Sequence, residues 1–474
     1  MGITLYNSMT RRKEELETIE PGKVRFYACG PTVYNLFHLG NARMFVVFDM
    51  IRRYLEYRGY EVKFVQNFTD VDDRIIQRAN ELKLGFREVA NRYIAAYFED
   101  ADALGIERAT VHPRVTECIP DIVSFVADLV DSGHAYERDG NVYFDASSFP
   151  EYGKLSGHSI AEVQSGFRIE VHEHKDDPAD FALWKAAKPD EEYWESPWGP
   201  GRPGWHIECS VMNAKYLGEQ IDIHAGGRDL IFPHHENEIA QTEAHFHKEF
   251  SRYWLHNGTL NINGEKMSKS TGNFIMTRDL LKQRPARAVR YYLLSAQYRN
   301  PLNFTEEGMD QAENALGRVD RSVKNLRHRV DGLRQQPHYL IEALSPDKDQ
   351  VALQVASVRT AFTAAMDDDF NSADGIAAIF EGVRQANTYV EQQNATPEGL
   401  QLWIDTIEEL MAVLGLHVES EVGMLEADIL KLIEDRNEAR ARRDFQRADE
   451  IRDELQNNGI ILEDTPQGTR WHKP

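Results

Sequence analysis

An apolar strand, a glycine break and an amphipathic helix follow one another near the start of the chain, and they constrain its fold most strongly. Residues 24–27 predict a short strand, which Gly30 and Pro31 end. A helix is expected from about Gly40, because apolar side chains recur there mostly three or four positions apart: Met44, Val47, Phe48, Ile51 and Leu55. Residues 61–65 predict a second strand. This order of elements predicts one half of a doubly wound, Rossmann-like parallel sheet, an α/β fold that binds nucleotides.

The rest of the chain changes character along its length. Residues 116–200 are rich in aromatic residues, histidine and proline and predict an insertion, after which residues 220–224 return to parallel-strand character, with a helix expected near Pro233. Beyond residue 300 the apolar positions alternate in steps of three and four, which predicts a helix packed along a neighbouring helix. The members of this seam are Met309, Ala312, Leu316, Val319, Val323, Leu326, Val330 and Leu333.

Further helical stretches at 351–366 and 372–392 complete a predicted all-helical bundle. One charged helix, a short apolar run and a turn predict a small α+β domain at the end of the chain. We therefore expect six regions: a catalytic domain in two halves (1–115 and 201–250), the insertion (116–200), a lysine-loop region (251–300), the bundle (301–418) and a C-terminal domain (419–474).

Charge and cysteine content exclude several classes of protein. The 77 acidic and 54 basic residues give a net charge of −23, which opposes indiscriminate binding of nucleic acid, so RNA would need local basic patches. Three cysteines cannot form a disulfide framework and fit a reducing, cytoplasmic environment. No apolar run approaches the ~18 residues that span a bilayer, and no secretory signal is expected.

The turn before the first helix carries His38, Gly40 and Asn41. An imidazole beside the free amides of a helix N-terminus favours a phosphate, and Gly40 lets a ligand approach the backbone. A glycine turn with a capping histidine explains the same residues. This motif alone leaves both interpretations open.

A second motif, residues 264–273, places Lys266 and Lys269 in a loop rich in serine and glycine, just after a hairpin signal at Asn263 and Gly264. Their ammonium groups can close on a triphosphate as charge builds on the leaving pyrophosphate. The alternative is a solvated loop with incidental lysines. An early histidine turn and a late lysine loop in one α/β chain are much more specific than either motif alone.

Two cysteines, a histidine and a glutamate form a dispersed candidate metal site. Cys29 follows the first strand and Cys209 lies in the segment 205–209, whereas His234 and Glu238 are four residues apart and so share a helical face. These side chains suit zinc, although buried inert thiols are the alternative. Spacing also leaves five competing ligands: His206, Asp222, His224, His235 and Glu236. Cys118 has no partner nearby and is expected to be structural.

Arginines recur at helical spacing in the tail, at Arg436, Arg440, Arg443 and Arg447. Acidic residues interleave with them, so a solvated, salt-bridged face is the alternative to an RNA-binding stripe. Arg470 and Trp471 favour the RNA interpretation, because an aromatic ring can stack on unpaired bases.

The chain resembles the cysteinyl-tRNA synthetases, a family of class I aminoacyl-tRNA synthetases, through most of its length. The segments that carry the resemblance occur in the family's order: residues 5–8, 27–34, 67–73, 180–185, 203–209, 226–238, 266–270, 365–370 and 462–471. In one departure, the class-wide four-residue motif often ends in histidine but ends here in Asn41, which can still donate a hydrogen bond to phosphate or ribose.

The resemblance implies an enzyme with two steps: L-cysteine and ATP give cysteinyl-adenylate, and the cysteinyl group then moves to the terminal adenosine of tRNA-Cys. It implies one zinc ion per subunit, which binds the substrate thiolate, and magnesium with ATP. The implied zinc ligands are Cys29, Cys209, His234 and Glu238. The implied phosphate-binding and catalytic residues are His38, Asn41, Lys266 and Lys269, with Asp229 at the nucleoside. The implied cysteine pocket is Gly30, Thr69 and Trp205. The bundle would bind tRNA, 251–300 its stem and 419–474 its anticodon; a monomer without membrane association is expected.

Three alternatives are weighed against this resemblance. The cysteine ligase of mycothiol synthesis, which acts on an amino-sugar, is shorter and lacks a tRNA-binding end. A non-catalytic RNA-binding paralogue predicts eroded residues at Lys266, Lys269 or Cys209. A zinc hydrolase built on residues 234–236 does not have the spacing of a metalloprotease helix.

Overall fold

The computed structural model describes most of the chain. The described residues are 2–160, 162, 175–189, 191–267, 273–335, 348–419, 424–442, 444–457, 460–465 and 468–472. The chain forms two compact units, residues 1–417 and 418–474, and each is described by itself. None of the described helices is both long and apolar enough to cross a membrane.

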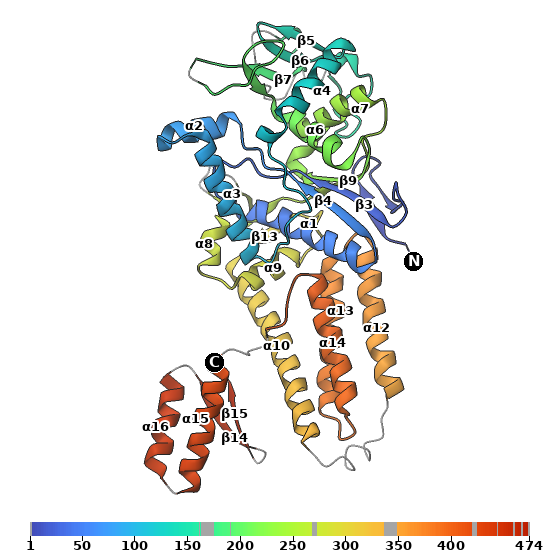
Figure 1. The fold of residues 1–474 in the computed structure, drawn as a ribbon. Helices are drawn as coiled ribbons and strands as arrows, with labels where there is room; N and C mark the ends of the chain where they lie inside the picture. The colour runs from blue at the N-terminus through green and yellow to red at the C-terminus, as the bar shows by residue number, and fades with distance from the viewer. Residues whose placement is uncertain are drawn as a thin grey trace. The chain divides into compact units, whose positions relative to one another are not determined.

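A four-stranded parallel sheet forms the centre of the first unit (Figure 1). In the order of the sheet, its strands are β10 (Ser251–Asn257), β9 (Ile221–Gly227), β3 (Lys23–Ala28) and β4 (Glu61–Gln66). The strands predicted at 24–27, 61–65 and 220–224 are β3, β4 and β9. β9 continues three residues beyond its predicted end, through the glycines at 226 and 227.

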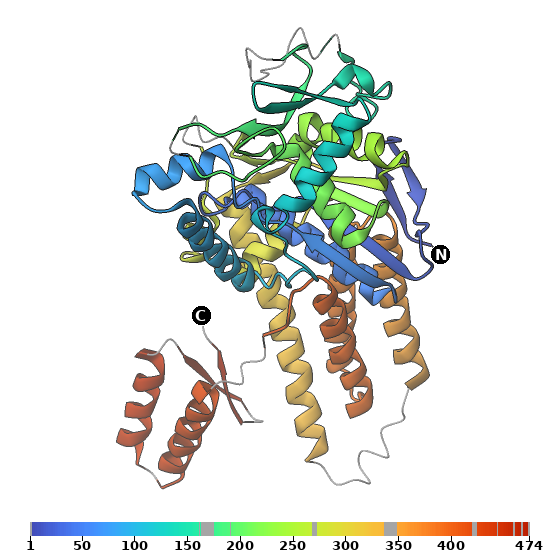
Figure 2. The same ribbon diagram turned by 45° about the horizontal axis from the view of Figure 1, so that its top comes forward.

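Helices cover both faces of this sheet. The helix α1 (Leu39–Tyr57) packs on one face and α6 (Trp205–Leu217) on the other (Figures 1 and 2). The connection after β3 leads to β4, whereas the connection through α6 leads to β9 on the other side of β3. The chain therefore reverses its direction of winding between β3 and β9, which confirms the doubly wound α/β fold. Ligands bind such sheets where the winding reverses, at the carboxyl ends of the strands.

The segment between β4 and α6 forms helices and a separate antiparallel sheet. The helices are α2 (Asp73–Leu82), α3 (Phe86–Ala103) and α4 (Ile119–Asp131), with short 3-10 turns at Val115–Glu117 and Ala146–Ser148. The sheet strands, in order, are β5 (Ala135–Arg138), β6 (Asn141–Phe144), β7 (Phe181–Ala186) and β8 (Gly201–Pro203). A hairpin of β1 (Thr4–Asn7) and β2 (Arg12–Glu15) precedes β3.

Short helical turns and a second small sheet follow β9. The turns η3 (Arg228–Leu230) and η4 (Ile231–His235) lead into α7 (Glu236–Phe246). The small sheet has the order β12 (Glu265–Lys266), β11 (Leu260–Ile262) and β13 (Leu302–Phe304). The helices α8 (Thr277–Leu281) and α9 (Ala286–Leu294) lie between β12 and β13 along the chain. The predicted hairpin turn joins β11 to β12, with positive φ at Asn263 (50°) and Gly264 (86°).

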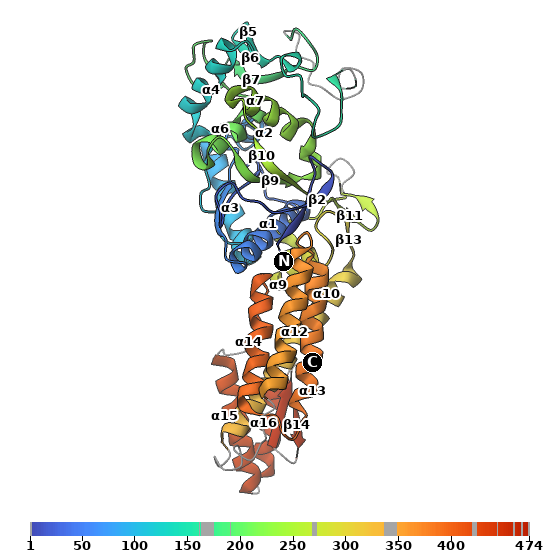
Figure 3. The ribbon, with the colours of Figure 1, turned by 90° about the vertical axis from the view of Figure 1, so that its right-hand side faces the viewer.

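In the described part of residues 301–418, four helices lie side by side and form the predicted bundle (Figure 3). They are α10 (Glu306–Arg334), α12 (Lys348–Asp367), α13 (Ser372–Val390) and α14 (Pro397–Val413). Every residue of the predicted apolar seam on α10 is buried. The helix α14 was not predicted; it begins with Thr396 accepting a hydrogen bond from the backbone of Gly399 and with Pro397 in its first turn.

The described residues of the second unit form two helices and a hairpin, whereas a single charged helix was expected before the apolar run. The helices are α15 (Met424–Ala441) and α16 (Phe445–Asn457), and the hairpin strands are β14 (Ile461–Thr465) and β15 (Gly468–His472). Its core contains Ile433, Ile451, Leu455 and Ile460.

The four arginines of the tail do not form one continuous exposed helical face, so this prediction is wrong. The first helix ends at Ala441, and Asp444 accepts a hydrogen bond from the backbone of Arg447 (3.1 Å), which starts a new helix. Arg436 is buried, and Arg443 lies outside the described residues. Trp471 packs against the core of this unit and stays partly exposed, so its stacking on bases remains a prediction.

Candidate active site

The four predicted metal ligands meet where the winding of the sheet reverses. Cys29 follows β3, Cys209 is on α6, His234 is in η4 and Glu238 is on α7; all four are buried. The two Sγ atoms are 3.9 Å apart, and Cys209 Sγ lies 3.6 Å from His234 Nε2. Glu238 Oε1 lies 2.9 Å from His234 Nε2 and 3.6 Å from Cys29 Sγ. One ligand atom from each residue lies within 4.8 Å of the others, so together they can surround a single ion.

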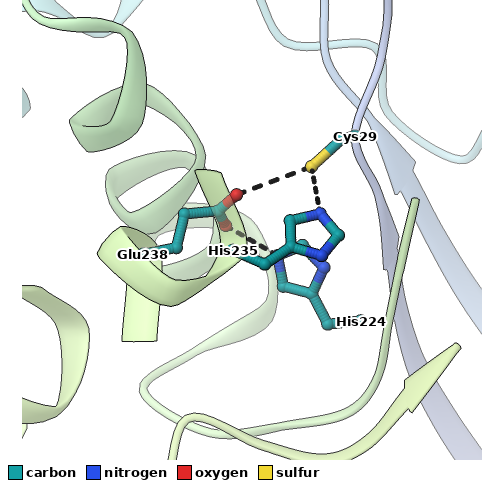
Figure 4. A group of neighbouring side chains, drawn as sticks. All are labelled: Cys29, His224, His235 and Glu238. Carbon is teal, nitrogen blue, oxygen red and sulfur yellow. Dashed lines mark hydrogen bonds and ion pairs between the residues drawn. The ribbon is translucent and has the colours of Figure 1, made fainter. Parts of the chain in front are cut away.

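A second set of donors overlaps the first (Figure 4). It keeps Cys29 and Glu238 and adds His224, from β9, and His235. His235 Nε2 lies 3.3 Å from Cys29 Sγ, and His224 Nε2 lies 2.7 Å from Glu238 Oε2. The two histidines therefore contact the ligands that both sets share, and they are the two competing ligands that geometry retains.

Three other competing residues have different partners. Asp222 accepts hydrogen bonds from the backbone amides of Ile19 (2.6 Å) and Arg25 (2.7 Å). Glu236 points to the insertion, where it accepts from the amides of Gly153 (3.0 Å) and Ser156 (2.7 Å). His206 contacts His234 through their Nδ1 atoms (2.9 Å), so it orients that ring through the nitrogen that does not face the other ligands.

Burial and close charges set the protonation of the cluster. Burial opposes ionisation of Glu238, but His224 and His234 outweigh it and hold the pKa of its carboxyl well below the usual range. Burial likewise opposes a charge on His234, but Glu238 raises its pKa to about 10. The contact with Cys29 lowers the pKa of Cys209 to about 6, whereas burial raises the pKa of Cys29 well above its usual value. The Glu238 carboxylate and the Cys209 thiolate thus face a positively charged His234 in a dry site, where a metal ion can replace the imidazole proton.

The residues expected to bind the amino acid surround this cluster. The Trp205 ring stacks on His234 with their centres 4.3 Å apart and remains 36% exposed. Gly30 donates its backbone N–H to Asn67 Oδ1 (2.8 Å), and Thr69 donates its hydroxyl to Glu208 Oε2 (2.7 Å). The structure therefore places Gly30 and Trp205 next to candidate metal ligands, and it links Thr69 to them through Glu208, the neighbour of Cys209.

Glu208 was not among the predicted site residues. It is buried beside Cys209, and burial raises the pKa of its carboxyl well above the usual range. Its only signal in the sequence was an acidic residue immediately before a candidate ligand. Through Thr69 and its neighbour Cys209 it connects the predicted amino-acid pocket to the candidate metal ligands.

Three of the predicted phosphate-binding residues are described by the structure: His38 and Asn41 lie at the start of α1, and Lys266 lies on β12. His38 caps α1, where its Nδ1 accepts a hydrogen bond from the backbone of Asn41 (3.2 Å). Lys266 ends β12, and the segment after the lysine loop returns to α1, since Leu39 donates its amide to the carbonyl of Ile275 (2.9 Å). Lys269 lies outside the described residues. Asp229 is exposed on η3.

Three family models match successive parts of the chain. Residues 15–314 match the tRNA synthetases class I (C) catalytic domain, 361–419 the DALR domain, and 423–471 the cysteinyl-tRNA ligase anticodon binding domain. A cysteine–tRNA ligase of Geobacillus sp. (strain WCH70) is 54% identical over 471 residues, which cover 99% of each chain. That of Brevibacillus brevis is 52% identical and covers 100% of both chains.

The chain belongs to the cysteine–tRNA ligase family. It is accordingly a class I aminoacyl-tRNA synthetase that ligates cysteine to tRNA, a reaction of protein biosynthesis. Full-length relatives and a matching anticodon binding domain disfavour the amino-sugar ligase. A zinc hydrolase and a non-catalytic paralogue receive no support from these relatives.

Solved structures of other synthetases share the fold. A Mycobacterium tuberculosis methionyl-tRNA synthetase in complex with methionyl-adenylate has a TM-score of 0.59 at 16% identity, over 83% of this chain and 89% of that one. A LeuRS of Agrobacterium radiobacter K84 has a TM-score of 0.60 at 13% identity, over 86% and 88%. At such low identity these structures support the fold alone.

Proposed function

We propose that the enzyme activates L-cysteine with ATP at the site described above and then transfers it to tRNA-Cys. In the first step a carboxylate oxygen of cysteine attacks the α-phosphorus of ATP, and pyrophosphate leaves. In the second step a hydroxyl of the terminal adenosine attacks the cysteinyl carbonyl, and AMP leaves. Neither step needs a protein nucleophile, so catalysis comes from positioning and electrostatic stabilisation.

The observation that carries this proposal is the buried cluster of Cys29, Cys209, His234 and Glu238 beside the amino-acid pocket. Two sulfur donors, an imidazole and a carboxylate within reach of one point fit zinc. Bound there, zinc would supply a Lewis acid that ligates the substrate thiolate and disfavours serine, whose hydroxyl keeps its proton. Selection by pocket shape alone is worth ~1–3 kcal/mol, whereas a 10⁴-fold preference needs about 5.5 kcal/mol.

His224 offers the Glu238 carboxylate a second hydrogen-bond partner besides the metal. Catalytic zinc usually keeps three protein ligands and one open position, whereas this site offers four. One oxygen of Glu238 already lies 2.7 Å from His224 Nε2. The carboxylate would therefore retain a buried partner if the substrate thiolate took its place among the ligands.

The ATP phosphates are assigned to His38, Asn41, Lys266 and Lys269, with Asp229 at the nucleoside and magnesium accompanying ATP. The N-terminus of α1 supports this assignment, because its free amides and dipole favour an anion. The anticodon is assigned to residues 419–474 and the body of the tRNA to 301–418. The enzyme is proposed to act as a monomer in the cytoplasm, where its three free cysteines stay reduced.

Pyrophosphate exchange with ATP, measured with each amino acid in turn, tests the reaction. We expect exchange to depend on cysteine. With serine, the kcat/KM of exchange should be lower by at least about 10⁴-fold. X-ray absorption at zinc tests the role of the metal: saturating cysteine should add one sulfur ligand. An unchanged sulfur count would leave the metal structural and would require another source of selectivity.

A further inference from the structure

A wholly buried arginine connects the helix that begins at the phosphate-binding turn to the strands that carry Lys266. Arg43 lies on α1 and is 0% exposed. Its guanidinium donates to four backbone carbonyl oxygens, those of Gly258 (3.1 Å), Thr259 (3.0 Å), Gln297 (3.4 Å) and Asn300 (2.8 Å). Burial lowers its pKa to about 10, which leaves it charged at neutral pH. In the part of the chain that the structure describes, no carboxylate pairs with Arg43, so carbonyl dipoles alone stabilise the charge.

These four carbonyls lie at the base of the β12–β11–β13 sheet. Gly258 and Thr259 connect β10 to β11, and residues 297–300 lead from α9 into β13. The two connections pack so closely that a Cβ on Gly258 would lie 2.4 Å from the carbonyl oxygen of Asn300. Within the sheet, Asn261 of β11 is opposite Lys266 of β12. Arg43 therefore holds the base of the hairpin on which Lys266 sits.

The far end of the lysine loop is also attached to the start of α1. His38 forms a β-bridge with Met276, and Thr277 donates its amide to the carbonyl of Phe37 (3.2 Å). Near the beginning of the loop, the Met267 side chain packs on Gly40, since a Cβ there would lie 2.8 Å from Met267 Cε. Residues at both ends of the lysine loop thus contact the turn that carries His38. Arg43 is the side chain that holds the hairpin from which the loop begins.

We propose that Arg43 is a positioning residue for adenylate formation, which sets the hairpin that carries Lys266 at a defined place relative to His38. This inference rests on the proposed function, in which these two residues bind ATP phosphates. A planar guanidinium can serve carbonyls of two connections at once, whereas a lysine ammonium places three donors on one atom and cannot span them. A misplacement of ~1 Å in such a site can cost about 10²-fold in rate.

The test compares Arg43→Lys with Arg290→Lys. Arg290 is a matched control because it is also wholly buried and bound to α1, through Asp49 (2.5 Å). It lies on α9 and donates to the carbonyls of Leu104 and Gly105, which follow α3, and of Leu414, which follows α14. None of these carbonyls belongs to the connections 258–259 and 297–300 that Arg43 contacts. Melting temperature is measured for both variants, and pyrophosphate exchange is measured well below both melting transitions.

Both variants should lower the melting temperature, but only Arg43→Lys should slow activation. Its kcat for exchange should fall about 10- to 100-fold with the KM for cysteine nearly unchanged, whereas Arg290→Lys should keep kcat within about twofold. Single-turnover transfer from preformed cysteinyl-adenylate to tRNA should proceed at the wild-type rate in Arg43→Lys, because pyrophosphate has already left.

Two results would overturn the inference: equal kcat for the two variants, or transfer slowed as much as exchange. If Arg43→Lys does not fold, Met267→Ala provides a second test, because it removes the contact between the lysine loop and Gly40. This partly exposed side chain can be removed without opening the core. A loss in kcat of about 3- to 10-fold supports the positioning role, and a wild-type kcat refutes it. A wild-type enzyme without cysteine-dependent exchange would refute the proposed function itself, which is a separate outcome.

Discussion

Replacing Gly30 by alanine should disable the metal site by forcing two adjacent strand ends apart. A Cβ on Gly30 would lie 1.6 Å from the carbonyl oxygen of Asn67 and 2.7 Å from its carbonyl carbon. Real Cβ atoms essentially never approach closer than 3.0 Å, so the two backbones must separate by about 1.4 Å, the difference between these distances. Neither atom is the end of a flexible side chain, and Gly30 directly follows the ligand Cys29. The displacement therefore reaches the metal cluster.

The expected cost is moderate for folding and large for function. Overpacking costs about 1–3 kcal/mol, and weakening the hydrogen bond from Gly30 to Asn67 adds ~1 kcal/mol. At ~2.1 cal/mol/K per residue, a unit of 417 residues loses about 1 °C in Tm per kcal/mol, which predicts a fall of about 2–5 °C. Metal–ligand distances tolerate only ~0.2 Å, so metal affinity should fall at least as steeply as for a lost supporting contact, about 10- to 100-fold.

The assay combines calorimetry, metal analysis of the purified protein and cysteine-dependent pyrophosphate exchange. Gly332→Ala is the control, because it lies on α10 in open space, where a Cβ would meet no atom within 4 Å, and it should gain up to ~1 kcal/mol from helix propensity. A Gly30→Ala protein with full metal content and a Tm within about 1 °C of wild type would show that the strand ends yield without disturbing Cys29. That result would refute the reasoning.

Three further predictions concern the other parts of the enzyme. Lys269→Ala should slow adenylate formation about 10²- to 10³-fold in pyrophosphate exchange with little change in cysteine affinity; a normal kcat would contradict a role in charge neutralisation. Deletion of residues 418–474 should leave exchange nearly intact, because this unit has its own core, but should abolish aminoacylation of tRNA; full charging would remove its assignment to the anticodon. Cys209→Ser should lose zinc and cysteine activation together, measured by metal analysis and exchange, and retention of both would exclude Cys209 as a ligand.

The sequence predicts best those elements whose pattern is local. The seam from Met309 to Leu333 is buried throughout because one helix meets its neighbours along a single stripe, and spacing alone reports that stripe. The β3–α1–β4 unit is similar, since glycine and proline mark its breaks. A capped start at Thr396 and Pro397 would have identified α14 by the same local logic.

The tail shows where this logic fails. Arginines at helical spacing fit one continuous helix, but spacing does not report where a helix ends. Asp444 caps a new helix, so Arg447 lies on α16 whereas Arg436 lies on α15. Arg436 is buried, a state that the polarity of its sequence neighbours argues against. Burial of a charged residue depends on tertiary packing, which short-range pattern does not contain.

The metal ligands could be predicted only in part from the sequence. Residue chemistry selected Cys29, Cys209, His234 and Glu238, yet their spacing could not separate them from His224 or His235. The doubly wound topology supplies the missing information, because it brings the carboxyl ends of strands to one edge of the sheet. Cys29 follows β3, Asn67 and Thr69 follow β4, and His224 lies on β9 beside β3, opposite Tyr27. Once the strand order is known, these residues must converge, and two overlapping donor sets that share Cys29 and Glu238 are the consequence.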